Sequence, residues 1–178
     1  MHISEGVLQA PVLVTGAALA AAGTAVGLRR IDYDRVMTVA ILAAAFFVAT
    51  LVHVPIGPSN AHLTLNGLLG LVLGWGAFPA VLAGLFLQAV FFQYGGFTAL
   101  GVNTVNMALP AVLCWLLLRG MVRRGGRPRA VAAFLAGSLS VLLAALLTAG
   151  SLAWSDEGFL VAAEALLLAH LPIAAIEG

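Results

Sequence analysis

Apolar residues fill almost the whole chain, and a few polar, glycine or proline breaks divide them into seven stretches. A helix needs about 20 predominantly apolar residues to cross a bilayer, and the third and fourth stretches are the shortest. The pattern predicts an all-α integral membrane protein, a bundle of seven transmembrane helices. The predicted helices run from about Val7–Leu28, Val36–Val54, Leu63–Leu73, Ala80–Phe92, Val105–Leu118, Ala130–Trp154 and Phe159–Ile176.

The breaks between these stretches carry the clearest local signals. Two prolines and a glycine lie between Pro55 and Pro58, so we expect the second helix to end there and a loop to run from Pro55 to His62. Gly95-Gly96 interrupts the chain after the fourth helix. Pro110, inside the fifth helix, predicts a kink.

Composition excludes a soluble globular domain. Of the 178 residues, 62% are hydrophobic and 8% are charged, whereas soluble domains have roughly 45–50% apolar and about 25% charged residues. The remaining polar side chains could not cover a water-facing surface. The single cysteine, Cys114, excludes an internal disulfide.

Charge placement predicts the orientation. The chain has no lysine, and its basic residues fall in the loops after the first and fifth predicted helices. With seven spans these loops lie on one side, which the positive-inside rule assigns to the cytoplasm. We therefore expect the N-terminus outside and the C-terminus in the cytoplasm. The two clusters are Arg29, Arg30 and Arg35, and Arg119, Arg123, Arg124, Arg127 and Arg129.

Small residues are frequent at Ala17–Ala22 and Ala43–Ala45. In lipid, such faces allow helices to approach closely. They indicate either packing within the bundle or a docking face for another membrane subunit.

The N-terminus is the most distinctive chemical feature. A chain that begins Met1-His2 offers its terminal amine, the amide nitrogen of His2 and the His2 imidazole in fused chelate rings, provided that the amine is free. His62, expected on the same side of the membrane, could supply a fourth nitrogen. Four-nitrogen tetragonal sites suit Ni(II) and Cu(II), and Co(II) is plausible in the same set. The alternative is a solvated loop histidine and a frayed terminus.

Amide side chains gather near the same side. We expect Asn60, Asn66, Gln88 and Asn103 to orient the metal ligands, although hydrogen bonds between helices are the alternative. Glu177, near the cytoplasmic end, is expected to pair with an arginine or with a partner protein.

Catalytic signatures are missing from the sequence. It contains no HExxH, no paired membrane aspartates and no phosphate-binding loop. We therefore expect a transport subunit and not an enzyme, and ATP hydrolysis would have to take place in partner proteins.

Five separated motifs resemble the CbiM/NikM family, the substrate-specific components of energy-coupling factor transporters for cobalt and nickel. The motifs cover nearly the whole chain. They are Met-His-Ile-Ser-Glu-Gly at 1–6, His-Val-Pro-Ile at 53–56 with Asn-Ala-His-Leu-Thr-Leu-Asn-Gly-Leu at 60–68, Gln-Ala-Val-Phe-Phe-Gln-Tyr-Gly-Gly at 88–96, Leu-Gly-Val-Asn-Thr-Val-Asn-Met at 100–107 and His-Leu-Pro-Ile-Ala-Ala-Ile-Glu-Gly at 170–178.

The resemblance implies one transmembrane domain over residues 1–178, with seven helices and an N-terminus that tucks into the bundle from outside. It implies that Met1, His2 and His62 hold the metal, which is substrate and not a resident cofactor. It also implies a multi-pass protein of the bacterial inner membrane. The implied partners are a coupling membrane subunit, two ATPase subunits and a small accessory membrane protein.

Two departures from the family pattern bear on these implications. Ser4 stands where the family commonly has proline or methionine, while Glu5 is more typical of cobalt than of nickel members. Relatives usually continue past the Glu-Gly at 177–178, so we expect a truncated C-terminus. A nickel-specific component, a component for an organic micronutrient and an intramembrane enzyme remain as alternatives.

Overall fold

The computed structural model describes residues 2–56 and 59–178, and the side chains of residues 53–61 lie outside that description. Within it, the chain forms seven α-helices and one two-stranded hairpin. Three 3-10 turns join helices at Tyr33–Arg35, Gly74–Gly76 and Glu157–Phe159. The elements are α1 (Ala10–Arg29), α2 (Val36–Ala49), β1 (His53–Ile56), β2 (Ser59–His62), α3 (Asn66–Leu73), α4 (Ala77–Phe92), α5 (Leu100–Arg124), α6 (Gly126–Ser155) and α7 (Leu160–Glu177).

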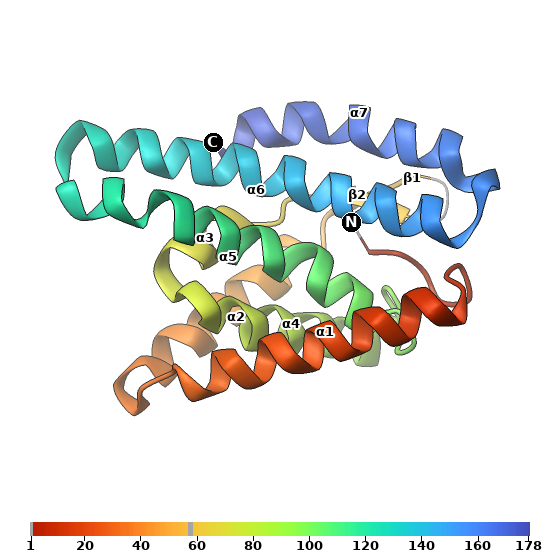
Figure 1. Cartoon of the computed structure of the whole chain (residues 1–178), viewed down its shortest axis with the longest axis horizontal. Coiled ribbons are helices and arrows are strands. Elements are labelled where there is room, and N and C mark those ends of the chain that lie inside the picture. The colour runs from red at the N-terminus through yellow and green to blue at the C-terminus, as the bar shows by residue number, and fades with distance from the viewer. Residues whose placement is uncertain (1, 57–58) are drawn as a thin grey trace.

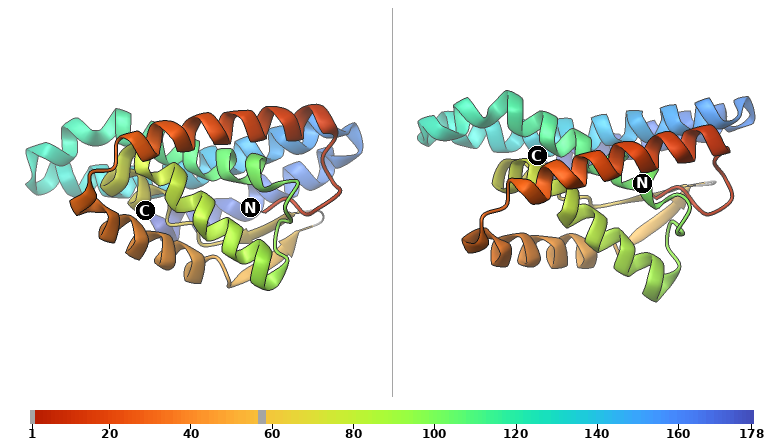
Figure 2. Two further views of the ribbon diagram at one scale, coloured as in Figure 1. Left: turned by 90° about the horizontal axis from the view of Figure 1, so that it is seen from below. Right: turned by 60° about the horizontal axis from the view of Figure 1, so that its bottom comes forward.

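Helix α5 forms the centre of the bundle, where it contacts α1, α3, α4 and α6 (Figure 1). Helix α7 packs on α6, and α2 packs on α4. Figure 2 shows α2 and α4 on the side of the molecule opposite α6 and α7. The hairpin lies between these two sides and contacts α7, and the N-terminal segment passes back from the start of α1 to lie beside β2.

Five segments of the described chain are long and apolar enough to cross a membrane: Ala10–Arg29, Asn66–Phe92, Leu100–Arg124, Gly126–Ser155 and Glu157–Glu177. The prediction of an all-α, multi-pass membrane protein is supported in its helical, membrane-spanning character, apart from one two-stranded hairpin. The count of seven spans is not confirmed. Three of the predicted helices are shorter than a full span of about 20 residues. Helix α2 has 14 residues, α3 has 8 and α4 has 16.

The segment 66–92 is not one straight helix. The Arg35 guanidinium donates to the carbonyl oxygen of Val72 at 2.7 Å, so α3 runs toward the end of the bundle that carries Arg35. Helix α4 begins at that same end, because Pro79 packs against Gly27 near the end of α1. The chain reverses direction at Gly74, whose φ of +55° suits a residue without a side chain.

The region that we predicted as a loop, Pro55 to His62, is instead an antiparallel hairpin, and this prediction was wrong. His53 pairs with His62 and Pro55 with Asn60. The preceding helix α2 ends at Ala49, before the predicted end at Val54, and Pro55 lies within β1, so proline does not end this helix. An irregular loop buried in a membrane bundle would leave backbone groups without partners, and pairing the two strands satisfies them.

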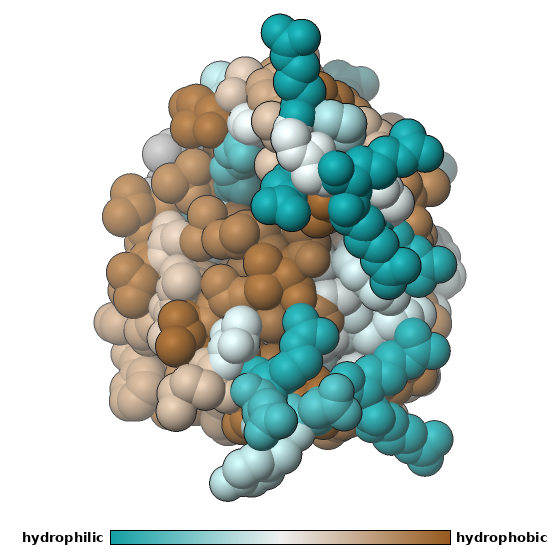
Figure 3. All heavy atoms as spheres, turned by 90° about the vertical axis from the view of Figure 1, so that its left-hand side faces the viewer, coloured by the Kyte–Doolittle hydropathy of each residue, from teal (hydrophilic) through white to brown (hydrophobic). Residues whose placement is uncertain are grey.

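Both arginine clusters lie at the same end of the bundle, where α1 and α5 end and α6 begins (Figure 1, left). Figure 3 looks at this end and shows its hydrophilic side chains gathered there. The opposite end carries Asp156 and Glu157. The assignment of the arginine end to the cytoplasm stays a prediction.

Helix α1 uses small residues to reach the rest of the bundle. Its buried positions include Gly16, Ala20, Gly23 and Gly27. A Cβ at Gly16 would meet Val102 of α5, and one at Gly23 would meet Phe78 of α4. These buried glycines pack on the chain's own helices. Of the alanines predicted at 17–22 only Ala20 is buried, while Ala17, Ala18, Ala21 and Ala22 are exposed, so the choice between packing and a docking face stays open for them.

Candidate metal centre

The segment before α1 is packed inside the bundle, although its sequence alone would also suit a frayed terminus. His2 is 1% exposed and Ile3 is 0% exposed. Ile3 packs in a cluster with Leu8, Val12, Val102 and Leu152. Burial of this side chain draws the neighbouring histidine into the protein interior.

Asn103 of α5 fixes the backbone next to His2. Its Oδ1 accepts a hydrogen bond from the Ile3 amide at 2.8 Å, and its Nδ2 donates to the Ile3 carbonyl at 3.1 Å. The side-chain amide thus pairs with both backbone groups of one residue, as a neighbouring strand would. Asn103 is 2% exposed, so this pairing is shielded from water.

Gly95 and Gly96 make room for the N-terminal segment. Both have φ near +75°, a conformation that favours glycine. A Cβ at Gly95 would lie 2.9 Å from Asn103 Nδ2 and 3.5 Å from His2 Cβ, and one at Gly96 would lie 2.7 Å from Glu5 Cβ. The two glycines at this break therefore leave the space that the N-terminal segment occupies.

His62 ends β2 and is 3% exposed. Its Nδ1 lies 2.8 Å from the Leu63 carbonyl oxygen. A carbonyl oxygen only accepts, so Nδ1 carries the proton and Nε2 carries a lone pair. Nε2 is buried and has no hydrogen-bond partner among the described residues. An orphaned, buried imidazole nitrogen of this kind is suited to bind a metal ion.

Burial is the main cause that holds the pKa of His62 well below its usual range, and the neighbouring His2 and His170 lower it further. The imidazole is therefore neutral at neutral pH. Only the neutral ring can donate a nitrogen lone pair to a metal.

The two histidines that the sequence singled out lie side by side. Their ring centroids are 4.6 Å apart, and their planes are inclined by 30°. They come from the N-terminal segment and from the end of β2. The fold thus brings together two of the three predicted metal-binding residues, while Met1 lies outside the described residues.

Two other predicted site residues, Asn66 and Gln88, make no side-chain hydrogen bond to the His62 ring where the structure describes the chain. Asn66 is 0% exposed, and neither atom of its amide has a partner among the described residues. Gln88, also fully buried, donates to the Phe47 carbonyl at 2.9 Å and to the Thr50 hydroxyl, so it ties α4 to α2. The side chain of Asn60 lies outside the described part of the chain.

Glu177 makes a contact that the sequence interpretation missed. We expected it to pair with an arginine or a partner protein. Instead, its carboxylate accepts hydrogen bonds from the Thr64 and Leu65 amides and from the Thr64 hydroxyl. No local sequence signal could have revealed this contact, because its partners are 112 and 113 residues away.

His170 of α7 is 0% exposed, and its Nδ1 donates to the Leu166 carbonyl at 2.7 Å within the same helix. Across the described residues, no group of three or more histidine, cysteine, aspartate and glutamate side chains converges on one point. A metal held by His2 and His62 would therefore need donors other than a third described histidine, cysteine, aspartate or glutamate side chain.

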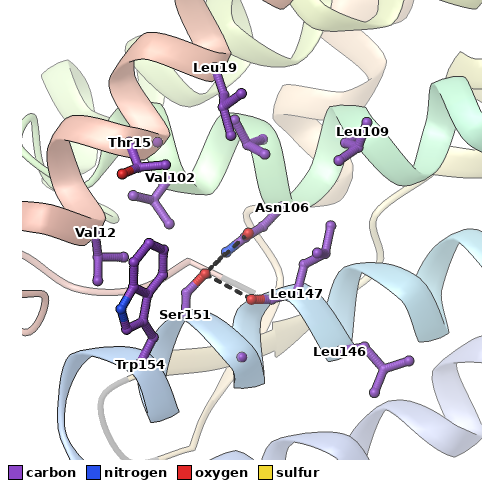
Figure 4. A pocket seen from close by; sticks show the side chains of 13 residues that line it. Val12, Thr15, Leu19, Val102, Asn106, Leu109, Leu146, Leu147, Ser151 and Trp154 are labelled. Carbon is purple, nitrogen blue, oxygen red and sulfur yellow. Dashed lines mark hydrogen bonds between the residues drawn. The ribbon is translucent and has the colours of Figure 1, made fainter.

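A groove of about 280 Å³ opens elsewhere, between α1, α5 and α6 (Figure 4). Its lining is mostly apolar, with Thr15, Asn106 and Ser151 among its polar residues. The Asn106 amide donates to the Ser151 hydroxyl at 3.3 Å, and that hydroxyl donates to the Leu147 carbonyl at 2.8 Å. No histidine lines it. The groove therefore offers no imidazole nitrogen.

Fold and site together define a class: a multi-pass helical membrane protein whose N-terminal histidine is buried beside a second histidine. The chain belongs to the CbiM family, described as the cobalt uptake substrate-specific transmembrane region, whose sequence profile matches residues 2–178. This confirms the resemblance seen in the sequence motifs.

Individual relatives agree with this membership. The chain is 54% identical over 123 residues to a Haemophilus influenzae protein named for metal transport, with 69% of this chain covered. It is 32% identical to the fused nickel transport protein NikMN of Rhodobacter capsulatus and 31% identical to the cobalt transport protein CbiM of Geobacter sulfurreducens, with 98% and 100% of this chain covered. The chain spans 60%, 57% and 56% of the lengths of these three relatives.

Two solved structures share the fold. A crystal structure of a transition metal transporter superposes with a TM-score of 0.85 at 29% identity, covering 99% of this chain and 86% of the other. A truncated transition metal transporter superposes with a TM-score of 0.78 at 27% identity, covering 99% and 92%.

Proposed function

We propose that this chain is the substrate-binding membrane subunit of an energy-coupling factor importer, which captures Co(II) or Ni(II) on the extracytoplasmic side and delivers it inward. The observation that carries the proposal is the buried contact between His2 and His62, in which a neutral imidazole presents an unpartnered Nε2. Relatives named for cobalt and for nickel transport support the choice of ion.

The spacing of the two rings fits a shared ion. An imidazole nitrogen binds such a metal at about 2.0 Å and lies about 1.1 Å from the centre of its own ring. When the two metal–nitrogen bonds form a right angle, the two ring centroids therefore lie about 4.5 Å apart. The observed separation is 4.6 Å. His2 and His62 could therefore occupy neighbouring corners of one square.

In the proposed site, the N-terminus supplies the other two ligands. The amine of Met1 and the amide nitrogen of His2 complete four nitrogens in the proposed site, and fused chelate rings hold three of them in one plane. Such a tetragonal set of nitrogen ligands suits Ni(II), and Co(II) is acceptable in it. Asn103 supports the arrangement by holding the Ile3 backbone on both sides.

Delivery needs energy that this subunit would draw from partners. The proposed partners are a coupling membrane subunit, two ATPase subunits and a small accessory membrane protein. The exposed arginines at one end of the bundle suit a cytoplasmic face of a bacterial inner membrane protein, where such subunits would act.

The decisive experiment moves the terminal amine one residue further from the amide nitrogen and imidazole of His2. The purified protein with its native N-terminus is compared with a variant carrying one extra alanine before Met1, by equilibrium dialysis against Co(II) and Ni(II) and by the absorption spectrum of the loaded protein. We expect tight binding by the first and loss of binding by the second. Equal affinity of the two proteins would refute the N-terminal site.

A further inference from the structure

Glu177, the last residue of α7, lies against the turn that follows His62. Its Oε2 accepts from the Leu65 amide at 2.9 Å and from the Thr64 hydroxyl at 3.0 Å, and its Oε1 accepts from the Thr64 amide. Thr64 is 0% exposed. A carboxylate from one end of the chain thus satisfies three donors of a single turn.

The turn needs such support. Leu65 has φ +51° and ψ +17°, a left-handed conformation that residues with side chains adopt rarely. It immediately precedes α3, whose first turn has no side-chain cap of its own. Strained backbone of this kind persists only where surrounding contacts hold it, and Glu177 supplies those contacts.

One peptide group connects Glu177 to His62. The bond between Leu63 and Thr64 places the Leu63 carbonyl and the Thr64 amide on the same planar unit. The Thr64 amide donates to Glu177, and the Leu63 carbonyl accepts from Nδ1 of His62. The carboxylate therefore acts on the imidazole through a single rigid peptide plane.

Helix α6 makes room for this contact. A Cβ at Gly137 would meet the backbone carbonyl of Glu177, so the absence of a side chain there lets the end of α7 reach the turn. Gly67, at the start of α3, packs on the backbone of Ala136 and Gly137 in the same way. The last turn of α7 and the first turn of α3 thus both pack on α6 near Gly137.

We propose that Glu177 is a positioning residue of the metal centre: through the Leu63–Thr64 peptide it fixes the His62 ring with Nδ1 protonated and Nε2 turned to the ion. Ring nitrogens that bind metals are commonly oriented by a carboxylate or a carbonyl on the opposite nitrogen, and here a carboxylate acts on that carbonyl's own peptide. The inference rests on the proposed metal-binding function.

The test compares Glu177→Gln with Glu164→Gln, which removes an exposed carboxylate from the same helix. Ni(II) affinity is measured by equilibrium dialysis, and the ligand field of bound Ni(II) by absorption. Because loss of a residue that orients a metal ligand commonly costs about 10–100-fold in affinity, we expect a loss in that range and a shifted spectrum for E177Q. E164Q should match the unchanged protein in both readouts.

A second background separates positioning from general support of the fold. In His62→Ala protein, Glu177→Gln should cause no further loss of the residual Ni(II) affinity, because Glu177 would act on the ion only through the His62 imidazole. A loss of equal size with and without His62 would overturn the proposal, as would wild-type affinity and spectrum for E177Q.

Thr64→Val keeps both backbone hydrogen bonds and removes only the hydroxyl bond. Thr64→Val should lose less Ni(II) affinity than E177Q and more than E164Q. If E177Q does not fold, Thr64→Val becomes the test of the positioning role. An unchanged affinity in T64V and in a folded Glu177→Asp variant would then overturn the proposal. Failure of the unaltered protein to bind Ni(II) or Co(II) would instead refute the proposed function itself.

Discussion

Asn103 and Ile3, a hundred residues apart, pair as if they were neighbours in a sheet: the side-chain amide of one meets both backbone groups of the other, at 2.8 and 3.1 Å. Since Ile3 follows His2 directly, this pairing sets where the His2 imidazole lies. It converts a chain end, normally free to fray, into a fixed part of the bundle interior.

Replacing Asn103 by alanine should therefore weaken both stability and metal binding. The Ile3 amide and carbonyl would remain buried without partners, at a cost of about 1–3 kcal/mol. We expect faster proteolysis of the N-terminal segment and at least a tenfold loss in Ni(II) affinity. Asn106→Ala, one turn further along α5 and paired with Ser151 beside the groove, is the matched control and should keep its affinity.

Gly96→Ala should displace the N-terminal segment. The new Cβ would press on Glu5, and the φ of +75° would cost a residue with a side chain about 1–2 kcal/mol. Metal affinity should fall, and thermal unfolding should begin at lower temperature. Gly120→Ala is the control, since nothing lies within 4 Å of a Cβ there. Equal behaviour of the two variants would contradict the role given to Gly96.

His62→Ala should lose more than about 100-fold in Ni(II) or Co(II) affinity, because it removes a ligand and not merely a group that supports one. His170→Ala should retain binding within about tenfold. His170 shares with His62 an Nδ1 bonded to a backbone carbonyl and a buried Nε2 without a hydrogen-bond partner among the described residues, so this variant tests which of the two rings binds the ion. Equilibrium dialysis on both variants checks this, and equal losses would mean that the centre has been misplaced.

Stability should fall on acidification, and His62 should account for part of the fall. Its folded pKa is held below the ordinary value of 6.5, so below pH 6.5 the unfolded chain takes up a proton that the folded chain does not. The free energy of unfolding then decreases as pH falls, by up to about 1.4 kcal/mol per pH unit. Above pH 6.5 both states are neutral, and His62 contributes nothing.

Thermal unfolding of metal-free protein between pH 5 and pH 8 measures this contribution. The dependence below pH 6.5 should be shallower in His62→Gln, which cannot titrate at this position. A profile identical to that of the unaltered protein would show that His62 is not held neutral. Metal binding should weaken over the same range, because the amide and imidazole nitrogens must be unprotonated to bind.

Helix positions were largely predictable because each depends on nearby residues. Apolar runs, the Pro55–Pro58 break and the paired glycines at 95–96 are local signals, and each predicted helix has a counterpart in the structure. The hairpin was not predictable in the same way. Its strands pair with each other and contact α7, and a single sequence does not show which distant segments will pack there.

The sequence by itself determined the membrane character, the separation of arginines to one end, and a histidine at position 2 that could chelate a metal, because these follow from composition, spacing and the chemistry of a chain end. Tertiary structure alone decided that His2 meets His62, that Asn103 holds Ile3, and that Glu177 reaches the turn after His62. Each of these contacts joins segments at least 60 residues apart in sequence. Distant contacts of this kind arise from how helices pack, where small residues such as Gly137 set the distance of approach, and not from the order of residues along any one helix.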